Sequence, residues 1–193
     1  MKNKYFITDF VKFSKQLNTA DVAAIQTELK EEYKALAVHY PKFHKMDLLS
    51  KLGFIATELL QKKVNFPSDT ALIFQNNASS LVTDIQHQKS IQEKDAYFPS
   101  PAVFVYTLPN IVMGEIAIRH QLQSENTFFI SENFQADFIK NYTQSLLDTK
   151  KASASISGWI DLNNEGYNVF LAFISEKGIL PFTTENLQHK FTA

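Results

Sequence analysis

Cysteine is absent from the 193 residues of this chain, and that absence excludes several kinds of chemistry at once. Without a thiol the protein forms no disulfide, binds no metal through thiolate and uses no thiolate nucleophile. Glycine is also scarce, with 5 residues, so few loops have the flexibility to wrap a phosphate. Cysteine-dependent catalysis and a glycine-rich nucleotide site are therefore not expected.

An excess of charge of one sign is missing as well. The chain has 19 Lys and Arg against 20 Asp and Glu, a formal net charge of −1, and its lysines are scattered. A nucleic-acid-binding surface needs a basic patch or stripe, so we expect no nucleic-acid partner. The 5 histidines lack metal-ligand spacing and no serine lies in a Gly-x-Ser-x-Gly motif. We therefore expect no metal, no cofactor and no serine hydrolase site.

Long apolar runs are the third absence. No run of roughly 18 apolar residues that would span a membrane is present in the sequence. The apolar run after the basic first residues is broken at Asp9, too early for a signal peptide. We therefore expect a cytoplasmic protein with no membrane span.

Bulky apolar side chains, by contrast, are abundant. Hydrophobic residues make up 45% of the chain, and 17 of them are Phe. This length and composition are typical of one domain, here residues 1–193, with a substantial core.

The order of periodic segments predicts the fold class. Apolar periodicity predicts helices at 19–38, 47–61, 79–91, 109–122 and 134–147. Thr19 is the predicted N-cap of the first helix, and Pro109 stands in the first turn of the fourth. Apolar runs predict strands at 5–7, 71–74, 127–130, 154–160 and 168–174. A turn at 163–166 makes the last two strands a hairpin, so we expect an α/β fold with a five-stranded mixed sheet covered by helices.

Several segments, taken in order, carry a resemblance to a known family. Segment 100–118 opens on a Ser-Pro pair and leads through apolar residues to Asn110, with Gly114 four residues later in an apolar helix. An early helix at 45–52 precedes this segment, and a strand end at 157–161, Ser-Gly-Trp-Ile-Asp, follows it. The numbers of residues between these segments are close to those in the family.

From about Met46 to about Lys177 the chain resembles the amino-terminal half of the β-ketoacyl synthases, which implies half of a thiolase-like fold. Counted from both flanks, Asn133 occupies the position of the family's catalytic cysteine, at the start of a buried helix. A carboxamide cannot hold an acyl thioester. Phe134 would fill space that a thioester substrate needs.

Other departures from the family agree with this interpretation. The glycines that the family has near Gln121 and Ser124 are absent, and Gln135 replaces a small residue after the nucleophile position. The chain also ends near the family's midpoint, and the resemblance places the two active-site histidines in the other half. We therefore expect no catalytic residue in this chain, and no enzyme activity.

The chain is similar to small chain-length-factor-like proteins of bacterial aryl polyene and related fatty-acid or polyketide pathways. The resemblance implies a catalytically inactive subunit that pairs with a complete β-ketoacyl-ACP synthase, or with itself, and helps shape an acyl tunnel. An acyl carrier protein is a further possible partner. The implied dimer interface comprises Thr127, Phe128, Phe129, Ile130 and Met113. The residues implied to face the tunnel are Leu81, Val82, Ile85 and Val103.

Alternatives stay open for the function and for single residues. One alternative is a stand-alone module that binds an acyl carrier protein or acyl-CoA. Another is an enzyme that uses a different site. Asn133 is also a good N-cap for the helix 134–147, whether or not it contacts an acyl group. Glu115 and Arg119 lie four residues apart and are expected to pair, on the surface or in an interface. Phe138 is expected among the most buried residues.

Overall fold

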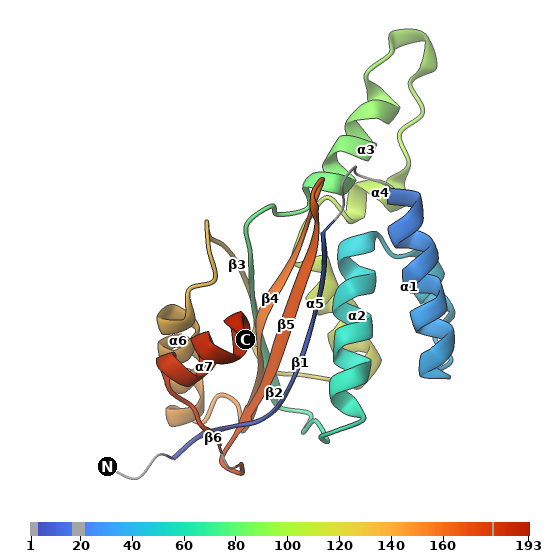
Figure 1. Cartoon of the computed structure of the whole chain (residues 1–193). Coiled ribbons are helices and arrows are strands. Elements are labelled where there is room, and N and C mark those ends of the chain that lie inside the picture. The colour runs from blue at the N-terminus through green and yellow to red at the C-terminus, as the bar shows by residue number, and fades with distance from the viewer. Residues whose placement is uncertain (1–3, 17–21, 179) are drawn as a thin grey trace.

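The computed structural model describes residues 4–16, 22–178 and 180–193. Figure 1 shows one mixed sheet with helices on both of its faces. The described strands follow the order β3-β2-β4-β5-β1-β6 across the sheet. Their bounds are β1 (Phe6–Gln16), β2 (Thr70–Asn76), β3 (Asn126–Ile130), β4 (Ala154–Asn163), β5 (Gly166–Ser175) and β6 (Leu180–Pro181).

The sheet combines a parallel and an antiparallel part. Strand β2 runs parallel to both of its neighbours, β3 and β4. The pairs β4–β5, β5–β1 and β1–β6 are antiparallel. Strand β3 is therefore one edge of the sheet, paired on a single side among the described strands.

The strand prediction was right in kind and wrong in number. The sheet has 6 described strands instead of five. The two-residue strand β6 was not predicted, and β1 extends well past the predicted 5–7. The second half of β1 is rich in polar residues, and the short alternation of Val11 and Phe13 with polar residues was missed as a strand signal. Pairing with β5 defines the full length of β1, because the two strands pair from Phe6 with Ser175 to Gln16 with Gly166.

Helices cover both faces of the sheet. One face carries α1 (Val22–Leu36), α2 (Leu48–Gln61) and α5 (Ile111–His120), and the other carries α6 (Ala136–Asp148) and α7 (Thr184–Thr192). Helix α3 (Leu81–Ile91) extends past the end of the sheet at the top of Figure 1, and the short helix α4 (Pro101–Val105) packs against it. Short 3-10 helices lie at Pro41–Lys45 and Lys94–Ala96. None of the helices in the described ranges combines the length and apolar content that a membrane crossing requires.

Two cores lie on opposite faces of the sheet. Every residue of β2 is buried, as expected for a strand covered on both sides. Leu72 and Phe74 point into the core beneath α1, α2 and α5, and Ile73 points into the core beneath α6 and α7. The central strands β2, β4 and β5 are thus the most enclosed part of the sheet.

The helix predictions need four corrections. Helix α5 begins at Ile111 with Asn110 as its N-cap, so Pro109 precedes the helix. The short helix α4, which precedes it, was not predicted. Helix α7 was not predicted, although Thr183 caps it by accepting the Asn186 N–H at 3.2 Å. The predicted cap Thr19 lies outside the described residues.

The fourth correction concerns Phe138, which is 42% exposed and not among the most buried residues. The side of α6 that packs on the sheet carries Ala136, Ile139, Thr143, Leu146 and Leu147. Phe138 lies on the flank of the helix. Helix α6 carries two apolar stripes, one with Phe138 and one with Ile139, and the sheet covers the stripe with Ile139.

Candidate functional site

A polar pocket of about 380 Å³ lies at the carboxyl end of the sheet, and we call it the carboxyl-end pocket. Its lining residues are Asn77, Glu132, Asn133, Phe134, Trp159, Asp161, Asn163, Asn168, Gln188 and Phe191. The connection from β2 to β3 runs over one face of the sheet and the connection from β3 to β4 over the other. Such a reversal beside a parallel strand leaves a crevice at the carboxyl ends of the strands, where α/β proteins bind ligands.

Asp161, the last residue of the Ser-Gly-Trp-Ile-Asp segment, holds one wall of this pocket. Its Oδ1 accepts the backbone N–H of Asn77 at 3.0 Å and that of Ala78 at 2.9 Å. The Asn77 side chain in turn donates to the Glu132 carbonyl at 2.9 Å. The loop after β2 is thereby fastened to the end of β4 and to the loop before α6.

Asn133 lies at the mouth of the pocket and does not cap α6. The helix begins three residues later, and its N-cap is Gln135, which makes no side-chain cap. The Gln135 N–H instead donates to the buried Gln75 side chain at 2.9 Å. The Asn133 carbonyl accepts from Ser131 Oγ and Gln135 Nε2. The N-cap prediction for Asn133 was wrong because the end of β2 supplies the acceptor.

The interior of the pocket is closed by aromatic rings. Phe134 is 6% exposed, and its ring centroid lies 4.4 Å from Phe191, 5.8 Å from Phe170 and 6.3 Å from Trp159. The lining residues named above include no histidine, lysine or cysteine. The ring of Phe134 therefore packs behind Asn133, and the charged side chains that line the pocket are the carboxylates of Glu132 and Asp161.

The outer strand β3 presents apolar groups together with its unpaired backbone edge. Ile130 at its end is 53% exposed. Ile118 on α5 is 63% exposed and Phe138 on α6 is 42% exposed, and these helices pack on opposite sides of β3. We call Ile118, Ile130 and Phe138 the edge surface. A strand edge with apolar neighbours is a surface that natural proteins usually cover.

The residues predicted for the interface differ in exposure: three are half-buried, one is exposed and one is buried. Phe128 packs toward the core beneath α5, while Phe129 faces α6, where its ring lies 5.3 Å from that of Tyr142. Thr127 and these two residues are half-buried, and only Ile130 is largely exposed. Met113 is 2% exposed and belongs to the core, so it offers no side chain to a partner.

The four predicted tunnel residues separate into two pairs. Val82 on α3 and Val103 on α4 line one pocket of about 190 Å³ that α1 and α2 also border. Leu81 is 41% exposed and Ile85 is half-buried, and neither lines that pocket. The structure therefore brings together only Val82 and Val103.

The expected pair between Glu115 and Arg119 does not form. Arg119 Nε donates to Glu58 on α2 at 2.6 Å. Glu115 accepts from Tyr106 Oη and Lys42 Nζ, each at 2.9 Å. Burial and the bond to Glu115 raise the pKa of Tyr106, which therefore stays a donor. Glu58 and Lys42 come from distant segments that no local spacing indicates.

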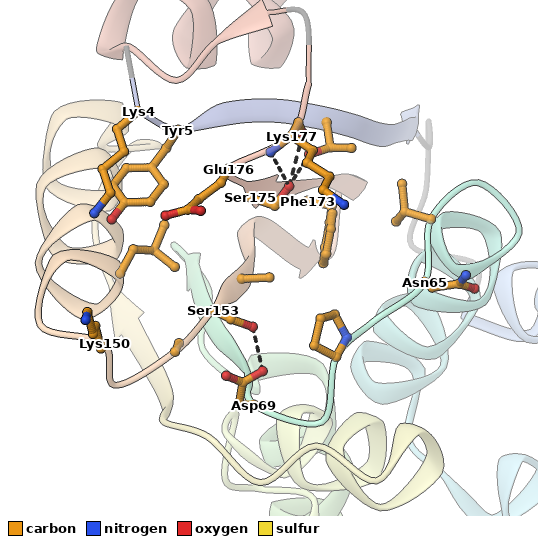
Figure 2. Close-up of a pocket in the computed structure, with 16 residues that line it drawn as sticks. Lys4, Tyr5, Asn65, Asp69, Lys150, Ser153, Phe173, Ser175, Glu176 and Lys177 are labelled. Atoms are coloured by element: carbon orange, nitrogen blue, oxygen red, sulfur yellow. Dashed lines mark hydrogen bonds between the residues drawn. The ribbon is translucent and has the colours of Figure 1, made fainter. Parts of the chain in front are cut away.

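A second hollow, of about 750 Å³, lies at the opposite end of the sheet, beside the starts of β2 and β4 (Figure 2). Ser153 Oγ donates to Asp69 Oδ1 there at 2.6 Å. Its ionisable lining residues are of both signs: Lys4, Lys150, Lys177, Asp69 and Glu176. A lining with charges of both signs gives the hollow no preference for an anionic or a cationic ligand.

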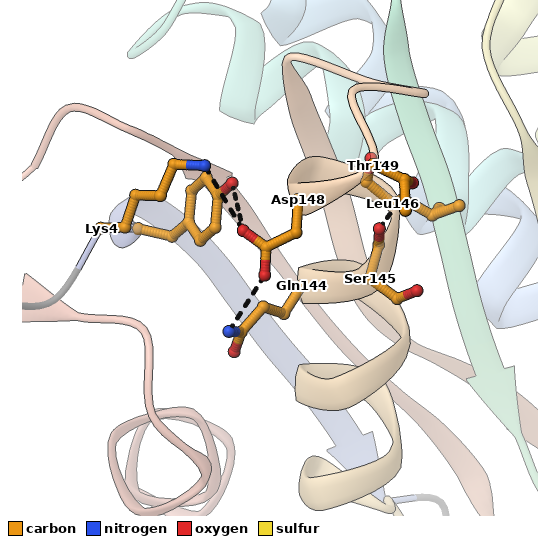
Figure 3. Close-up of polar contacts among 7 residues, drawn as sticks. Lys4, Gln144, Ser145, Leu146, Asp148 and Thr149 are labelled. Carbon is orange, nitrogen blue, oxygen red and sulfur yellow. Dashed lines mark hydrogen bonds and ion pairs between the residues drawn. The ribbon is translucent and has the colours of Figure 1, made fainter.

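A small polar cluster at the edge of that hollow joins β1 to α6 (Figure 3). Asp148 accepts from Tyr5 Oη at 2.9 Å and from Lys4 Nζ at 3.4 Å. The Tyr5 hydrogen bond is the main reason that the pKa of Asp148 is lowered. The cluster holds Lys4 and Tyr5, just before β1, against the end of α6, which is a structural role.

Comparison with known proteins identifies the fold. No protein-family model matches the chain, and no curated protein matches it in sequence. Among solved structures, the chain is similar to the ishigamide ketosynthase/chain length factor, with a TM-score of 0.65, 14% identity, and 89% of this chain and 62% of that one covered. The chain is also similar to a chain in the structure of a type II PKS acyl-carrier protein in complex with its ketosynthase bound to the hexaketide. That match has a TM-score of 0.63 and 13% identity, with 92% of this chain and 64% of that one covered.

A third similar structure is a chain in the complex of the ketosynthase ApeO with its chain length factor ApeC from Xenorhabdus doucetiae. It has a TM-score of 0.59 and 11% identity, and 96% of this chain and 89% of that one are covered. The chain thus spans less than two thirds of the length of two of these relatives and nearly all of the third. Its fold is the thiolase-like fold found in complexes of ketosynthases with chain length factors.

Proposed function

We propose that this protein is a catalytically inactive, chain-length-factor-like subunit that pairs with a complete ketosynthase. In this proposal the pair acts in fatty-acid, polyketide or aryl polyene biosynthesis, and the chain helps shape the acyl tunnel of its partner. Val82 and Val103, which share one pocket, are the side chains proposed to border that tunnel.

The observation that carries the pairing is the edge position of β3. Its outer backbone groups have no strand partner among the described residues, and the edge surface beside it is apolar. Backbone N–H and C=O groups at a sheet edge are satisfied at low cost by another strand, and apolar side chains beside them add buried area. A ketosynthase strand, or β3 of a second copy when no ketosynthase is present, would satisfy both.

Inactivity is supported by composition and by the carboxyl-end pocket. The sequence contains no cysteine, so the acyl-transfer step of a ketosynthase has no thiolate to use. Asn133 stands at the pocket mouth, and the ring of Phe134 fills the space behind it. A carboxamide at that position can donate or accept a hydrogen bond and cannot form a thioester.

The test of pairing uses the protein tagged in its native cells and purified with its companions. A ketosynthase recovered at equal stoichiometry is the expected result. An acyl carrier protein recovered without a ketosynthase would favour the stand-alone binding module instead. A parent protein that sediments as a monomer at high concentration, alone and with the ketosynthase, would refute the proposal.

Variants then locate the contact. Ile130→Asp and Ile118→Asp place a charge on exposed positions of the edge surface, so both proteins should stay folded by circular dichroism and lose the complex. Ala23→Asp is the matched control, because Ala23 is exposed on α1, on the far side of α2 from β3. An acid in the first turn of a helix is also favourable. Folded edge variants that keep the parent's assembly state would contradict pairing through β3.

A separate experiment addresses inactivity. Intact-mass spectrometry after incubation with acyl-CoA or an acyl carrier thioester should show no covalent adduct. Asn133→Cys should not restore condensation, because no histidine lines the pocket to assist the new thiol. A stoichiometric acyl adduct on the parent protein would overturn this part of the proposal while leaving pairing open.

A further inference from the structure

Lys51 is a buried lysine without an ionic partner. It is the fourth residue of α2 and is 3% exposed. Among the residues that the structure describes, its side chain makes no hydrogen bond and no ion pair, and its ammonium group lies 5.9 Å from the ring centroid of Phe43. A largely buried ammonium group without an ion-pair partner is unfavourable, so such groups are normally paired. Burial also lowers the pKa of Lys51.

The nearest acid does not meet this need, because its oxygens are engaged elsewhere. Asp47, one turn earlier on α2, accepts the Ser50 N–H with Oδ1 at 2.9 Å and the Thr83 hydroxyl with Oδ2 at 2.8 Å. These bonds cap α2 and fasten α3 to it. The carboxylate is close enough to influence Lys51 electrostatically and forms no ion pair with it.

Lys51 lines the pocket of about 190 Å³ between α1, α2, α3 and α4. Met46, Val82 and Val103 give this pocket apolar walls. Exposed polar side chains lie toward solvent, namely Gln26, His44, Lys45 and Gln86. The Asp47 carboxylate, both of whose oxygens already accept hydrogen bonds, also lines the pocket. The pocket therefore combines a largely buried cation, aliphatic walls and a polar mouth.

We propose that this pocket binds a short aliphatic carboxylate, with the carboxylate accepting a hydrogen bond from Lys51 Nζ and the aliphatic stem lying against Val82 and Val103. One water occupies about 30 Å³ in the liquid, so a volume of about 190 Å³ suits a ligand of about six heavy atoms. An acyl-CoA or a pantetheine arm is too large to enter whole. A carboxylate is favoured over a neutral group because charge-assisted hydrogen bonds are the stronger kind.

Only the shared residues Val82 and Val103 connect this site to the proposed function. The site is tested on the protein alone, so a failure to bind leaves pairing through β3 untouched. Equally, a failure to pair leaves this site untouched.

Butyrate and its neutral isostere butyramide serve as probes, titrated into the purified protein and followed by calorimetry and amide chemical shifts. Butyrate should bind at least about tenfold more tightly than butyramide. Lys51→Met should weaken butyrate at least about tenfold, while Lys45→Met, the same charge change at the exposed mouth, should keep affinity within about twofold. Val103→Trp, which fills the pocket from α4, should also abolish binding and serves if Lys51→Met does not fold.

Three outcomes would overturn the site. These are no saturable butyrate binding to the folded parent, equal affinity for butyramide, and an equal loss in Lys45→Met and Lys51→Met. The last would mean that general surface charge attracts the anion.

Discussion

The ring of Phe129 meets the ring of Phe138 edge-on, with 4.7 Å between their centroids and 79° between their planes. Phe129 belongs to the outer strand β3 and Phe138 to α6, so the contact fastens the helix to the edge of the sheet. Phe138 nevertheless remains 42% exposed. The contact therefore lies at the margin of the fold, within the edge surface proposed to pair.

Truncation of Phe138 should accordingly be tolerated better than truncation of a core ring. We expect Phe138→Ala to lower the free energy of unfolding by about 1–2 kcal/mol, from partial burial and one aromatic pair. Phe170→Ala, at a residue with 0% exposure, should cost about 3–5 kcal/mol. Chemical denaturation measures both, and equal losses would contradict the marginal position of Phe138.

Replacement by alanine should destabilise the protein at one glycine and stabilise it at another. A Cβ at Gly158 in β4 would lie 1.9 Å from the Phe170 carbonyl oxygen, which is backbone and cannot give way. We expect Gly158→Ala to cost more than about 3 kcal/mol or to prevent folding. A Cβ at Gly114 in α5 meets nothing within 4 Å, so Gly114→Ala should stabilise the monomer by about 0.5–1 kcal/mol. Thermal unfolding of the two variants checks both signs.

The ion pair between Arg119 and Glu58 should matter more than a surface pair. The Glu58 side chain is 5% exposed, and among the described residues Arg119→Ala would leave its charge with His120 alone, at 3.5 Å. We expect a loss of about 2–4 kcal/mol, because an uncompensated buried charge is costly. Lys4→Ala, which breaks the exposed pair with Asp148 in Figure 3, should change stability little. Similar losses in urea denaturation would refute the distinction.

Asp47 should make stability depend on pH. Burial raises the pKa of Asp47, and its bonds from Ser50 and Thr83 oppose that shift. An acid whose pKa is raised by folding contributes stability that is fully present below its unfolded pKa, about 3.9, and lost as pH rises through the folded value. Asn cannot ionise, yet its amide oxygen can still accept the Ser50 N–H.

Asp47→Asn should therefore gain stability relative to the parent as pH rises from about 4 toward neutrality. Urea denaturation at several pH values measures this difference. Asp47→Ala is the control, because it loses the cap at every pH, a cost of about 1 kcal/mol. A difference between Asp47→Asn and the parent that is independent of pH would contradict the assignment.

Local signals in the sequence determined several elements of this fold. The apolar run at 71–74 lies within β2, and the turn at 163–166 joins β4 to β5, whose ends pair at Asn163 and Gly166. Helix α2 lies within the predicted range 47–61, with Asp47 as its N-cap. These features depend on neighbours a few residues apart. The absence of cysteine is likewise a property of the sequence alone.

Tertiary structure decided which side of each element is buried and which charges meet. Ile139 is buried and Phe138 is not, because the sheet covers one of two apolar stripes on α6. Arg119 binds Glu58 and not Glu115, since α5 packs on α2. Partners such as these are far apart along the chain and come together only when the sheet forms, so no periodicity within one element encodes them.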